Sequence, residues 1–304
     1  MRPSLIALSL AAALATAACA AAPTARGDTN VLGARFDCLR NGALLVSAHR
    51  AVWDDTTPEN SLAAIRRTGR EIPGAMLEID VAMTADGALV LMHDDDLERT
   101  TTGTGEVARL TLAEVRRARL VDGAGRTTEE PVPTFVEALA AVREIGGVAS
   151  IDFKIEGDRE RLFRAVVEAV RAEDMAEAAV LIAPNLEDAR ALHRLAPELS
   201  LSVPIDEVGD LAGLDPTRVL AWTGTREPRP GLWRALAAQG VEPMFGTLGR
   251  EGVRRDDRFA ADGDTSEYAG LAREGLAIVA TDTPAAVRAG APEAVADAGR
   301  CLRD

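Results

Sequence analysis

Residues 43–83 read ALLVSAHRAVWDDTTPENSLAAIRRTGREIPGAMLEIDVAM, a pattern that predicts a strand, a helix and a second strand. Ala43–Ala48 and Ala75–Met83 are short apolar runs, as expected for buried strands. Between them, Ser61–Arg70 has the length and composition of a helix, with Asn60 placed as its N-cap. A strand–helix–strand unit of this length predicts two parallel strands joined by a crossover helix.

The same alternation continues to the end of the chain. Further strands are expected at Leu89–His93, Val148–Lys154, Ala179–Ala183, Leu199–Val203, Val219–Thr223, Glu242–Phe245 and Leu276–Ala280. Further helices are expected at Thr134–Ile145, Arg159–Ala172, Leu186–Leu195, Val203–Leu214 (poorly marked), Gly231–Gln239, Ser266–Arg273 and Pro284–Ala289. About eight such units predict an α/β protein, a closed (β/α)₈ barrel of the TIM type rather than an open sheet.

One segment interrupts the alternation. Arg99–Pro133 is rich in Thr and Arg and carries only one helix signal, Leu112–Ala118. We therefore expect a small insertion at about residues 97–133, after the second strand unit, within a single barrel domain that spans residues 41–304. A polar, Asp-rich loop at Gly249–Thr265 is expected to decorate the rim of the barrel.

Composition limits the partners of the protein. The chain has 34 Lys and Arg residues against 48 Asp and Glu residues, for a net charge of −14. Nucleic acid is not an expected partner, because binding it begins with neutralisation of phosphates by basic side chains. An anionic substrate would need a locally positive pocket, formed by a metal ion or by well-placed Arg and Lys side chains.

The N-terminal residues predict export. Residues 1–18 combine a basic start with an apolar, Ala-rich run that is typical of a signal peptide. Cys19 follows Thr-Ala-Ala and is a lipidation candidate, because the segment is similar to a lipoprotein cleavage box. The alternative is cleavage by the ordinary signal peptidase nearby. Residues 19–40 would then form a tether, and the protein would be periplasmic, either soluble or anchored to a membrane.

Two further cysteines lie near the two ends of the mature chain. In an oxidising compartment Cys38 and Cys301 form a disulfide candidate, because a closed barrel brings its termini together. Two free buried thiols are the alternative.

Chemically active residue types gather where the predicted strands end. His49 ends the first strand, and Glu78 and Asp80 lie two residues apart near the end of the second, so their side chains share one face. Asp152 and Lys154 repeat this spacing on a later strand. Since catalytic groups of such barrels lie at the C-terminal ends of the strands, these side chains are expected at one mouth.

This set of residues points to metal-assisted attack on a phosphodiester. Three carboxylates form an all-oxygen set that suits one Mg²⁺ or Ca²⁺ ion. His49 and His93 can act as general acid and base, because imidazole titrates near neutral pH. Arg50 and Lys154 can contact phosphate oxygens. Structural histidines and solvated acids are the alternative reading, whereas His193, in a predicted helix, is expected to be structural or exposed.

Six short motifs follow one another along the first third of the chain: His49-Arg50-Ala51, Pro58-Glu59-Asn60-Ser61, Glu78-Ile79-Asp80-Val81, Thr84-Ala85-Asp86-Gly87, His93-Asp94 and Arg99-Thr100-Thr101-Thr102-Gly103. In this order and spacing they resemble the glycerophosphodiester phosphodiesterase family. Weaker likenesses follow at Asp152-Phe153-Lys154, Trp222-Thr223 and Thr281-Asp282-Thr283-Pro284. The resemblance covers residues 44 to about 289.

The resemblance implies a (β/α)₈ barrel that hydrolyses glycerophosphodiesters to glycerol 3-phosphate and an alcohol. It implies a divalent cation held by Glu78, Asp80 and Asp152, acid and base roles for the two histidines, and phosphate contacts from Arg50 and Lys154. Two positions depart from the family pattern. Ala51 replaces a usual Gly, and Asp152 is shorter than the usual Glu, which bears on the preference for substrate and metal.

Two rival interpretations keep the same barrel. The first is a phospholipase D-like enzyme, of the lysophospholipase D or sphingomyelinase D type, that acts on lipid head groups. The second is a non-enzymatic barrel that binds a phosphate ligand or an envelope partner through a decayed site. The complete set of histidines and acids argues against the second. The sequence alone does not distinguish which histidine is the base.

Overall fold

The computed structural model describes Gly33 and residues 36–302 of the 304-residue chain. The predicted signal peptide, the lipidation candidate Cys19 and most of the predicted tether lie outside the described residues. Within the described part, no helix combines the length and the apolar character needed to span a membrane.

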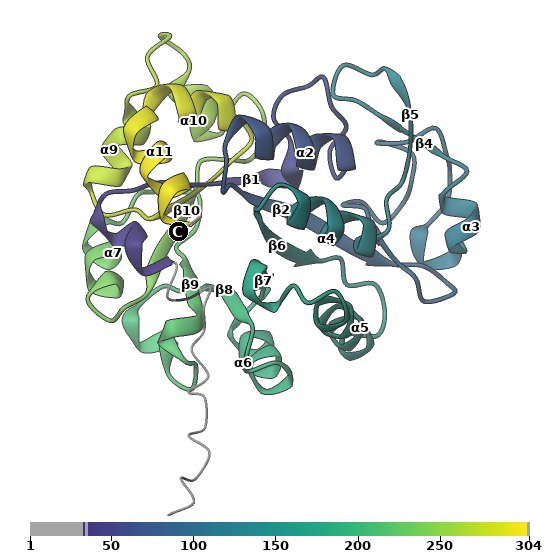
Figure 1. Cartoon of the computed structure of the whole chain (residues 1–304), viewed down its shortest axis with the longest axis horizontal. Coiled ribbons are helices and arrows are strands. Elements are labelled where there is room, and N and C mark those ends of the chain that lie inside the picture. The colour runs from purple at the N-terminus through teal and green to yellow at the C-terminus, as the bar shows by residue number, and fades with distance from the viewer. Residues whose placement is uncertain (1–32, 34–35, 303–304) are drawn as a thin grey trace, which may run out of the picture.

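Eight parallel strands form a closed barrel, which confirms the predicted (β/α)₈ fold (Figure 1). They are β1 (Leu45–Ala48), β2 (Met76–Met83), β6 (Val148–Phe153), β7 (Ala179–Ile182), β8 (Ser200–Pro204), β9 (Val219–Trp222), β10 (Glu242–Gly246) and β11 (Ile278–Thr281). Each strand pairs with the next along the chain, and the last, β11, pairs with β1. The ring closes between β1 and β2, where Ser47 and Ala48 are aligned with Met76 and Leu77.

Helices surround the barrel. They are α2 (Leu62–Glu71), α4 (Phe135–Glu144), α5 (Arg159–Ala172), α6 (Leu186–Leu195), α7 (Pro230–Ala237), α8 (Arg255–Phe259), α9 (Glu267–Arg273), α10 (Pro284–Gly290) and α11 (Pro292–Cys301). The sequence also predicts a helix over Val203–Leu214, but the structure has only the 3-10 turn η5 (Val208–Leu211) there, followed by η6 (Pro216–Arg218). Gly209 and Gly213 explain the difference, because glycine weakens a helix and Gly213 has a φ of 82°.

Two cores stabilise the barrel, and the alternation of strand residues separates them. Val46 of β1 packs in an outer core with helix residues such as Ile65 of α2. Its neighbour Leu45 packs in an inner core with residues of the other strands, including Met76. The separation follows from strand geometry, since successive side chains point to opposite faces. Polar residues at a strand end that share the inward face therefore come together in the mouth of the barrel.

The start of α2 differs by one residue from the prediction. Ser61, not Asn60, is the N-cap, and its side chain accepts a hydrogen bond from the Ala64 amide at 2.9 Å. Asn60 has a φ of 54° and turns its amide group to Asp80 instead. The prediction was wrong because both residue types cap helices well, and only tertiary contacts decide between them.

The segment between β2 and α4 forms a separate lobe beside the barrel (Figure 1). It contains β3 (Leu89–Leu91), antiparallel to β2, and then η3 (Val107–Arg109), α3 (Leu112–Val115) and the hairpin of β4 (Arg119–Val121) and β5 (Thr127–Pro131). The predicted insertion at residues 97–133 corresponds to the part after β3. The lobe has a small apolar core of its own, formed by residues such as Leu97, Val115 and Leu120.

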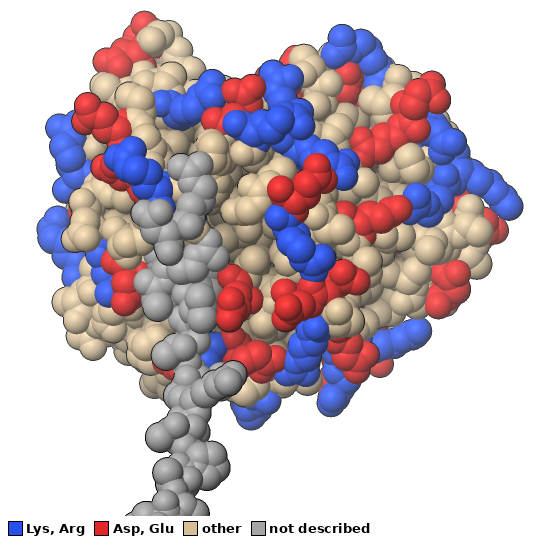
Figure 2. Space-filling model, in the orientation of Figure 1, with Lys and Arg blue, Asp and Glu red and all other residues tan. Residues whose placement is uncertain are grey.

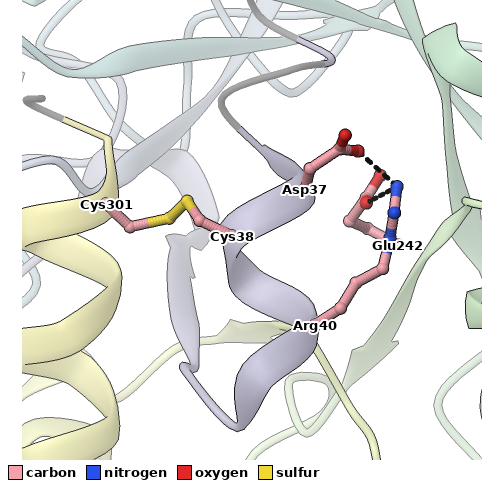
Figure 3. The surroundings of a disulfide bond; sticks show 5 residues. All are labelled: Asp37, Cys38, Arg40, Glu242 and Cys301. Atoms are coloured by element: carbon pink, nitrogen blue, oxygen red, sulfur yellow. Dashed lines mark hydrogen bonds and ion pairs between the residues drawn. A yellow bond between two sulfur atoms is a disulfide. The ribbon is translucent and has the colours of Figure 1, made fainter.

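A disulfide joins the two ends of the described chain. Cys38 lies on the 3-10 helix η1 (Asp37–Asn41), and Cys301 is the last residue of α11. The two sulfur atoms are bonded, with the Cα atoms 6.0 Å apart (Figure 3). Beside the disulfide, Arg40 of η1 forms an ion pair with Glu242 at the start of β10, at 2.6 Å. Together these contacts fasten η1 to the barrel.

Candidate active site

The structure brings the predicted acids together at the C-terminal end of the barrel strands. Glu78 and Asp80 lie on β2, and Asp152 lies directly beside Asp80 on the neighbouring strand β6. One oxygen atom from each of the three carboxylates lies within 4.8 Å of the others. Glu78 is 8% exposed and Asp80 is 1% exposed, so the cluster lies at the bottom of the mouth and not on the outer surface.

Burial and mutual repulsion make it unfavourable for all three carboxylates to be ionised at once. Burial raises the pKa of Glu78, and the charges of Asp80 and Asp152 raise it further. Burial would also raise the pKa of Asp80, but the neighbouring Lys154 ammonium lowers it below its ordinary value. Three ionised carboxylates this close together are stable only beside positive charge. The Lys154 ammonium lowers the pKa of Asp80, but the pKa of Glu78 stays raised.

Lys154 follows β6 and turns its ammonium to the acids. Its Nζ lies 2.8 Å from Oδ1 of Asp80 and 2.6 Å from Oδ2 of Asp152. These carboxylates raise the pKa of Lys154 to about 12 against the opposing effect of burial. In the structure Lys154 is thus an ion-pair partner of the acid cluster.

Each of the two predicted catalytic histidines is bonded to a carboxylate through Nδ1. Nδ1 of His49 lies 2.6 Å from Oδ1 of Asp282, and Nδ1 of His93 lies 2.7 Å from Oδ1 of Asp94. Since an ionised carboxylate only accepts hydrogen bonds, the proton lies on Nδ1 of each ring, which leaves Nε2 able to accept a proton. This is the arrangement of a general base held in one tautomer by an acid.

Asp282 is a residue of the site that the sequence did not assign. Its second oxygen accepts hydrogen bonds from the Gly249 amide at 3.0 Å and from Nη1 of Arg254 at 2.9 Å. Burial would raise the pKa of Asp282, but the hydrogen bond and charge of His49, with those donors, lower it to about 2. Burial in turn lowers the pKa of His49, and Asp282 and Glu78 more than offset this, so that it is raised.

The first loop of the mouth has an unusual backbone. Arg50 and Ala51 have φ values of 54° and 59°, in the left-handed region that favours glycine. The turn directs the Arg50 amide to Oε2 of Glu78 at 2.7 Å, which fixes the buried acid. The position where the family pattern has Gly therefore does have a positive φ. Ala51 accommodates this conformation while its fully buried methyl group packs in the outer core.

The side chain of Arg50 points away from the solvent toward acids. Its Nη1 donates to both oxygens of Glu59, at 2.9 and 3.0 Å. Its Nε is buried, donates no hydrogen bond to the described residues and lies 3.9 Å from Oδ2 of Asp80. Asn60 completes the loop, since its amide donates to Asp80 at 2.6 Å. Arg50 thus lies beside the acid cluster, and its Nε–H remains unpaired among the described residues.

A cavity of about 300 Å³ lies in the barrel mouth beside these groups. His49, Glu78 and Asp152 line one side of it. The opposite side is mostly apolar. It is formed by Ile182, Ala183, Pro184, Ser202, Pro204, Trp222, Met244, Leu248 and Ala280. A ligand in this cavity would meet charge on one face and hydrocarbon on the other.

The acid cluster fits a hard divalent cation. The donors are all carboxylate oxygens, the type that Mg²⁺ and Ca²⁺ prefer. Oδ1 of Asp80 is buried and is paired with the Lys154 ammonium at 2.8 Å, which leaves Glu78 without a cation of its own. A bound cation would supply that charge and lower the pKa of Glu78.

Comparison with known proteins agrees with this geometry. The pattern of the glycerophosphoryl diester phosphodiesterase family matches residues 49–207, more than half of the chain. A glycerophosphodiester phosphodiesterase from Caldanaerobacter subterraneus subsp. tengcongensis is 29% identical over 165 residues, which cover 52% of this chain and 65% of that protein. Human glycerophosphodiester phosphodiesterase 1 is 40% identical over 97 residues, or 31% of this chain and 28% of that protein. The matches thus span less than two thirds of the length of these relatives.

Solved structures share the fold. A glycerophosphoryl diester phosphodiesterase from Parabacteroides distasonis has a TM-score of 0.72 and 24% identity, with 85% of this chain and 90% of that chain covered. A phosphodiesterase from Oleispira antarctica, solved with the product sn-glycerol-3-phosphate, has a TM-score of 0.65 and 21% identity, with 84% and 99% covered. Taken with the match to the family pattern, these findings place this chain in the glycerophosphoryl diester phosphodiesterase family.

Proposed function

We propose that the protein hydrolyses glycerophosphodiesters to glycerol 3-phosphate and an alcohol, and that a divalent cation is required. The observation that carries the proposal is that two carboxylate-bonded histidines lie near a cluster of three acids, with His49 close enough to Glu78, and His93 to Asp80, for their charges to interact. Membership of the family supports it. The product found in the Oleispira antarctica phosphodiesterase supports the same substrate class.

Glu78, Asp80 and Asp152 are the residues that would hold the cation, either Mg²⁺ or Ca²⁺. When bound, the cation supplies positive charge that polarises the phosphate and stabilises the charge of the transition state. Its presence would also reconcile an anionic substrate with a protein whose net charge is −14.

His49 and His93 supply the proton transfers of the reaction. One imidazole removes the proton of the attacking hydroxyl through Nε2, and the other protonates the oxygen of the leaving alcohol as the P–O bond breaks. The attacking hydroxyl is that of water or the neighbouring hydroxyl of the substrate's own glycerol, which would give a cyclic phosphate first. Asp282 and Asp94 hold the rings and stabilise the imidazolium that forms.

Arg50 and Lys154 bind the phosphoryl group. Both side chains already lie beside the acid cluster, Arg50 through Nε at 3.9 Å and Lys154 through Nζ at 2.8 Å from oxygens of Asp80. Each keeps N–H groups that can turn to phosphate oxygens, and both become more effective as charge develops in the transition state.

The experiment that tests the function is an assay of deacylated phospholipids with choline, ethanolamine, glycerol and inositol as leaving alcohols. We expect release of glycerol 3-phosphate that EDTA abolishes and that added Mg²⁺ or Ca²⁺ restores. Glu78→Gln should remain inactive after metal is added, whereas Glu168→Gln, an exposed acid on α5, should behave as the wild type. Release that resists EDTA, or no release from any diester, would overturn the proposal.

One observation favours a second candidate function, phospholipase D-like action on lysophospholipids or sphingolipids. The cavity wall opposite the acids is apolar and includes Trp222, Met244 and Leu248, which suit an acyl chain. The comparison of glycerophosphocholine with its monoacyl analogue separates the two functions. If lipid is the substrate, Trp222→Ala lowers kcat/KM for the monoacyl compound much more than for the deacylated one. Equal effects on both compounds favour the glycerophosphodiester.

We also propose that the protein is exported to the periplasm and anchored through lipidated Cys19. The proposal is supported by the apolar N-terminal run followed by Thr-Ala-Ala-Cys. Wild-type protein should enter the detergent fraction of cells and carry a lipid-modified N-terminal Cys19 in mass spectrometry. The Cys19→Ser variant should enter the soluble fraction, and an unmodified wild-type Cys19 would contradict the anchor.

A further inference from the structure

The guanidinium of Arg99, in the inserted lobe, connects two carboxylates on different loops of the barrel mouth. Its Nε and Nη2 donate to Asp94 at 2.5 and 2.9 Å. Its Nη1 and Nη2 donate to Glu59 at 2.9 and 2.8 Å. Each carboxylate thus receives two hydrogen bonds from one planar group, a geometry that lysine cannot reproduce. We call Arg99, Asp94 and Glu59 the Arg99 clasp.

At one end the clasp fixes a catalytic imidazole. Oδ1 of Asp94 accepts from both Nδ1 of His93 and Nη2 of Arg99, while Oδ2 accepts from Nε of Arg99. Hydrogen bonds to both oxygens therefore fix the orientation of the carboxylate plane. Without Arg99, the Asp94 carboxylate could rotate about its broad terminal torsion, and the ring would follow it.

At the other end the clasp fixes a phosphate-binding candidate. The two oxygens of Glu59 that bind Arg99 also accept hydrogen bonds from Nη1 of Arg50. Glu59 is 18% exposed and Arg50 is 20% exposed at their side chains, so this end is largely shielded from water. Arg50 and Arg99 together lower the pKa of Glu59 against the effect of burial.

The backbone that carries Arg99 is anchored in the insertion. Thr100 and Thr101, which follow it, are both buried. The carbonyl of Thr100 accepts from the Val121 amide at 2.8 Å, and the hydroxyl of Thr101 donates to the carbonyl of Leu97 at 2.7 Å. The guanidinium is half-exposed, but the backbone that follows Arg99 is held by β4 and by Leu97.

We propose that Arg99 is a positioning residue, through which the inserted lobe aligns His93 with the phosphate-binding Arg50. The expected effect on catalysis rests on the proposed function, whereas the expected effect on the geometry of Asp94 and His93 does not.

The kinetic test compares four variants with the wild type on glycerophosphocholine. Arg99→Met should lower kcat by roughly 10- to 100-fold, the scale of a small misplacement of a catalytic group, with KM changed far less. Glu59→Gln should raise KM more than it lowers kcat, since it acts through Arg50. Arg99→Lys should recover only part of the loss. Arg126→Met, which breaks the ion pair with Asp122 elsewhere in the insertion, is the control and should match the wild type.

A double variant separates positioning from general damage. If Arg99 acts through Asp94, Arg99→Met should have almost no further effect on kcat in an Asp94→Asn background. Independent, multiplicative losses would overturn the proposal, as would wild-type kcat in Arg99→Met.

A spectroscopic readout keeps the test independent of activity. The chain has only three histidines, so the Nδ1 proton of His93 can be assigned by NMR with a His93→Gln variant. We expect a downfield, exchange-protected resonance in the wild type and in Arg126→Met, and its loss in Arg99→Met. An unchanged resonance in Arg99→Met overturns the clasp. Inactivity of the wild type toward every diester would overturn the proposed function while this resonance still decides the positioning.

Discussion

Each imidazole of the site is paired with one carboxylate, and each carboxylate is in turn held by an arginine. Asp282 binds His49 and accepts from Arg254, while Asp94 binds His93 and accepts from Arg99. The arginine offsets the charge of the acid while leaving it able to orient the ring. The two units come from distant parts of the chain, and both lie near the acid cluster, where the charge of His49 acts on Glu78 and that of His93 on Asp80.

Loss of either imidazole should remove a proton transfer. His49→Ala and His93→Ala should each lower kcat by at least ~10²-fold, the usual contribution of a general acid or base. Asp282→Asn should also lower kcat, since an amide can hold the wrong tautomer of His49. Steady-state kinetics on glycerophosphocholine measures these effects, with His193→Ala on α6 as the control. Turnover close to the wild type in either alanine variant would remove that histidine from the mechanism.

At the scale of elements, η1 and β10 are joined by the ion pair between Arg40 and the buried Glu242. This pair should make the free energy of unfolding depend on pH. Glu242 is 3% exposed, and burial raises its pKa to about 7 although Arg40 opposes this. Between its ordinary value of 4.5 and 7, the folded protein binds more protons at Glu242 than the unfolded chain. The stabilisation is complete below the ordinary pKa and is lost as pH rises through about 7.

Glu242→Gln should remove this dependence. The free energy of unfolding of the wild type, relative to the variant, should fall by roughly 2.5 kcal/mol between pH 5 and pH 8. Urea denaturation at several pH values measures the difference. A constant difference across this range would show that Glu242 titrates normally in the folded state.

Most of the elements could be predicted because local signals and the parallel sheet agree. The Glu78 and Asp80 spacing on one strand and Asp152 on a later one sufficed to predict an acid cluster, since parallel strands end at one rim. The η5 segment failed because its glycines weaken a helix that the sequence marks poorly. The sequence did not predict a role for Asp282, because Asp282 lies 233 positions from His49. No local sequence pattern indicates a contact between the first and last strands, which meet where the barrel closes.

Considered as a whole, the molecule is a ring whose two ends are tied together by Cys38 and Cys301. Acidic and basic side chains are interspersed on the face shown in Figure 2, so the described residues visible there form no broad area of one charge. Three of the acids lie together in the mouth, beside Lys154. If the proposed function is right, a cation bound by these carboxylates would lower their repulsion of an anionic substrate.

Closure by the disulfide should stabilise the whole domain. Cys38→Ser/Cys301→Ser should lower the free energy of unfolding by about 2–4 kcal/mol, because the unfolded chain regains the freedom that the cross-link removes. Denaturation with and without reductant measures this. Reductant should lower the stability of the wild type to that of the double variant and leave the variant unchanged. If reductant breaks the disulfide of the wild type but leaves its free energy of unfolding unchanged, the bond contributes no stability.

The most direct test of the site is anomalous diffraction from crystals of the protein soaked with Mn²⁺, which accepts the same oxygen ligands as Mg²⁺. We predict one strong peak in contact with carboxylate oxygens of Glu78, Asp80 and Asp152, on the side of the cavity that His49 lines. A mouth without a peak, or a peak bound only by acids elsewhere on the molecule, would contradict the site.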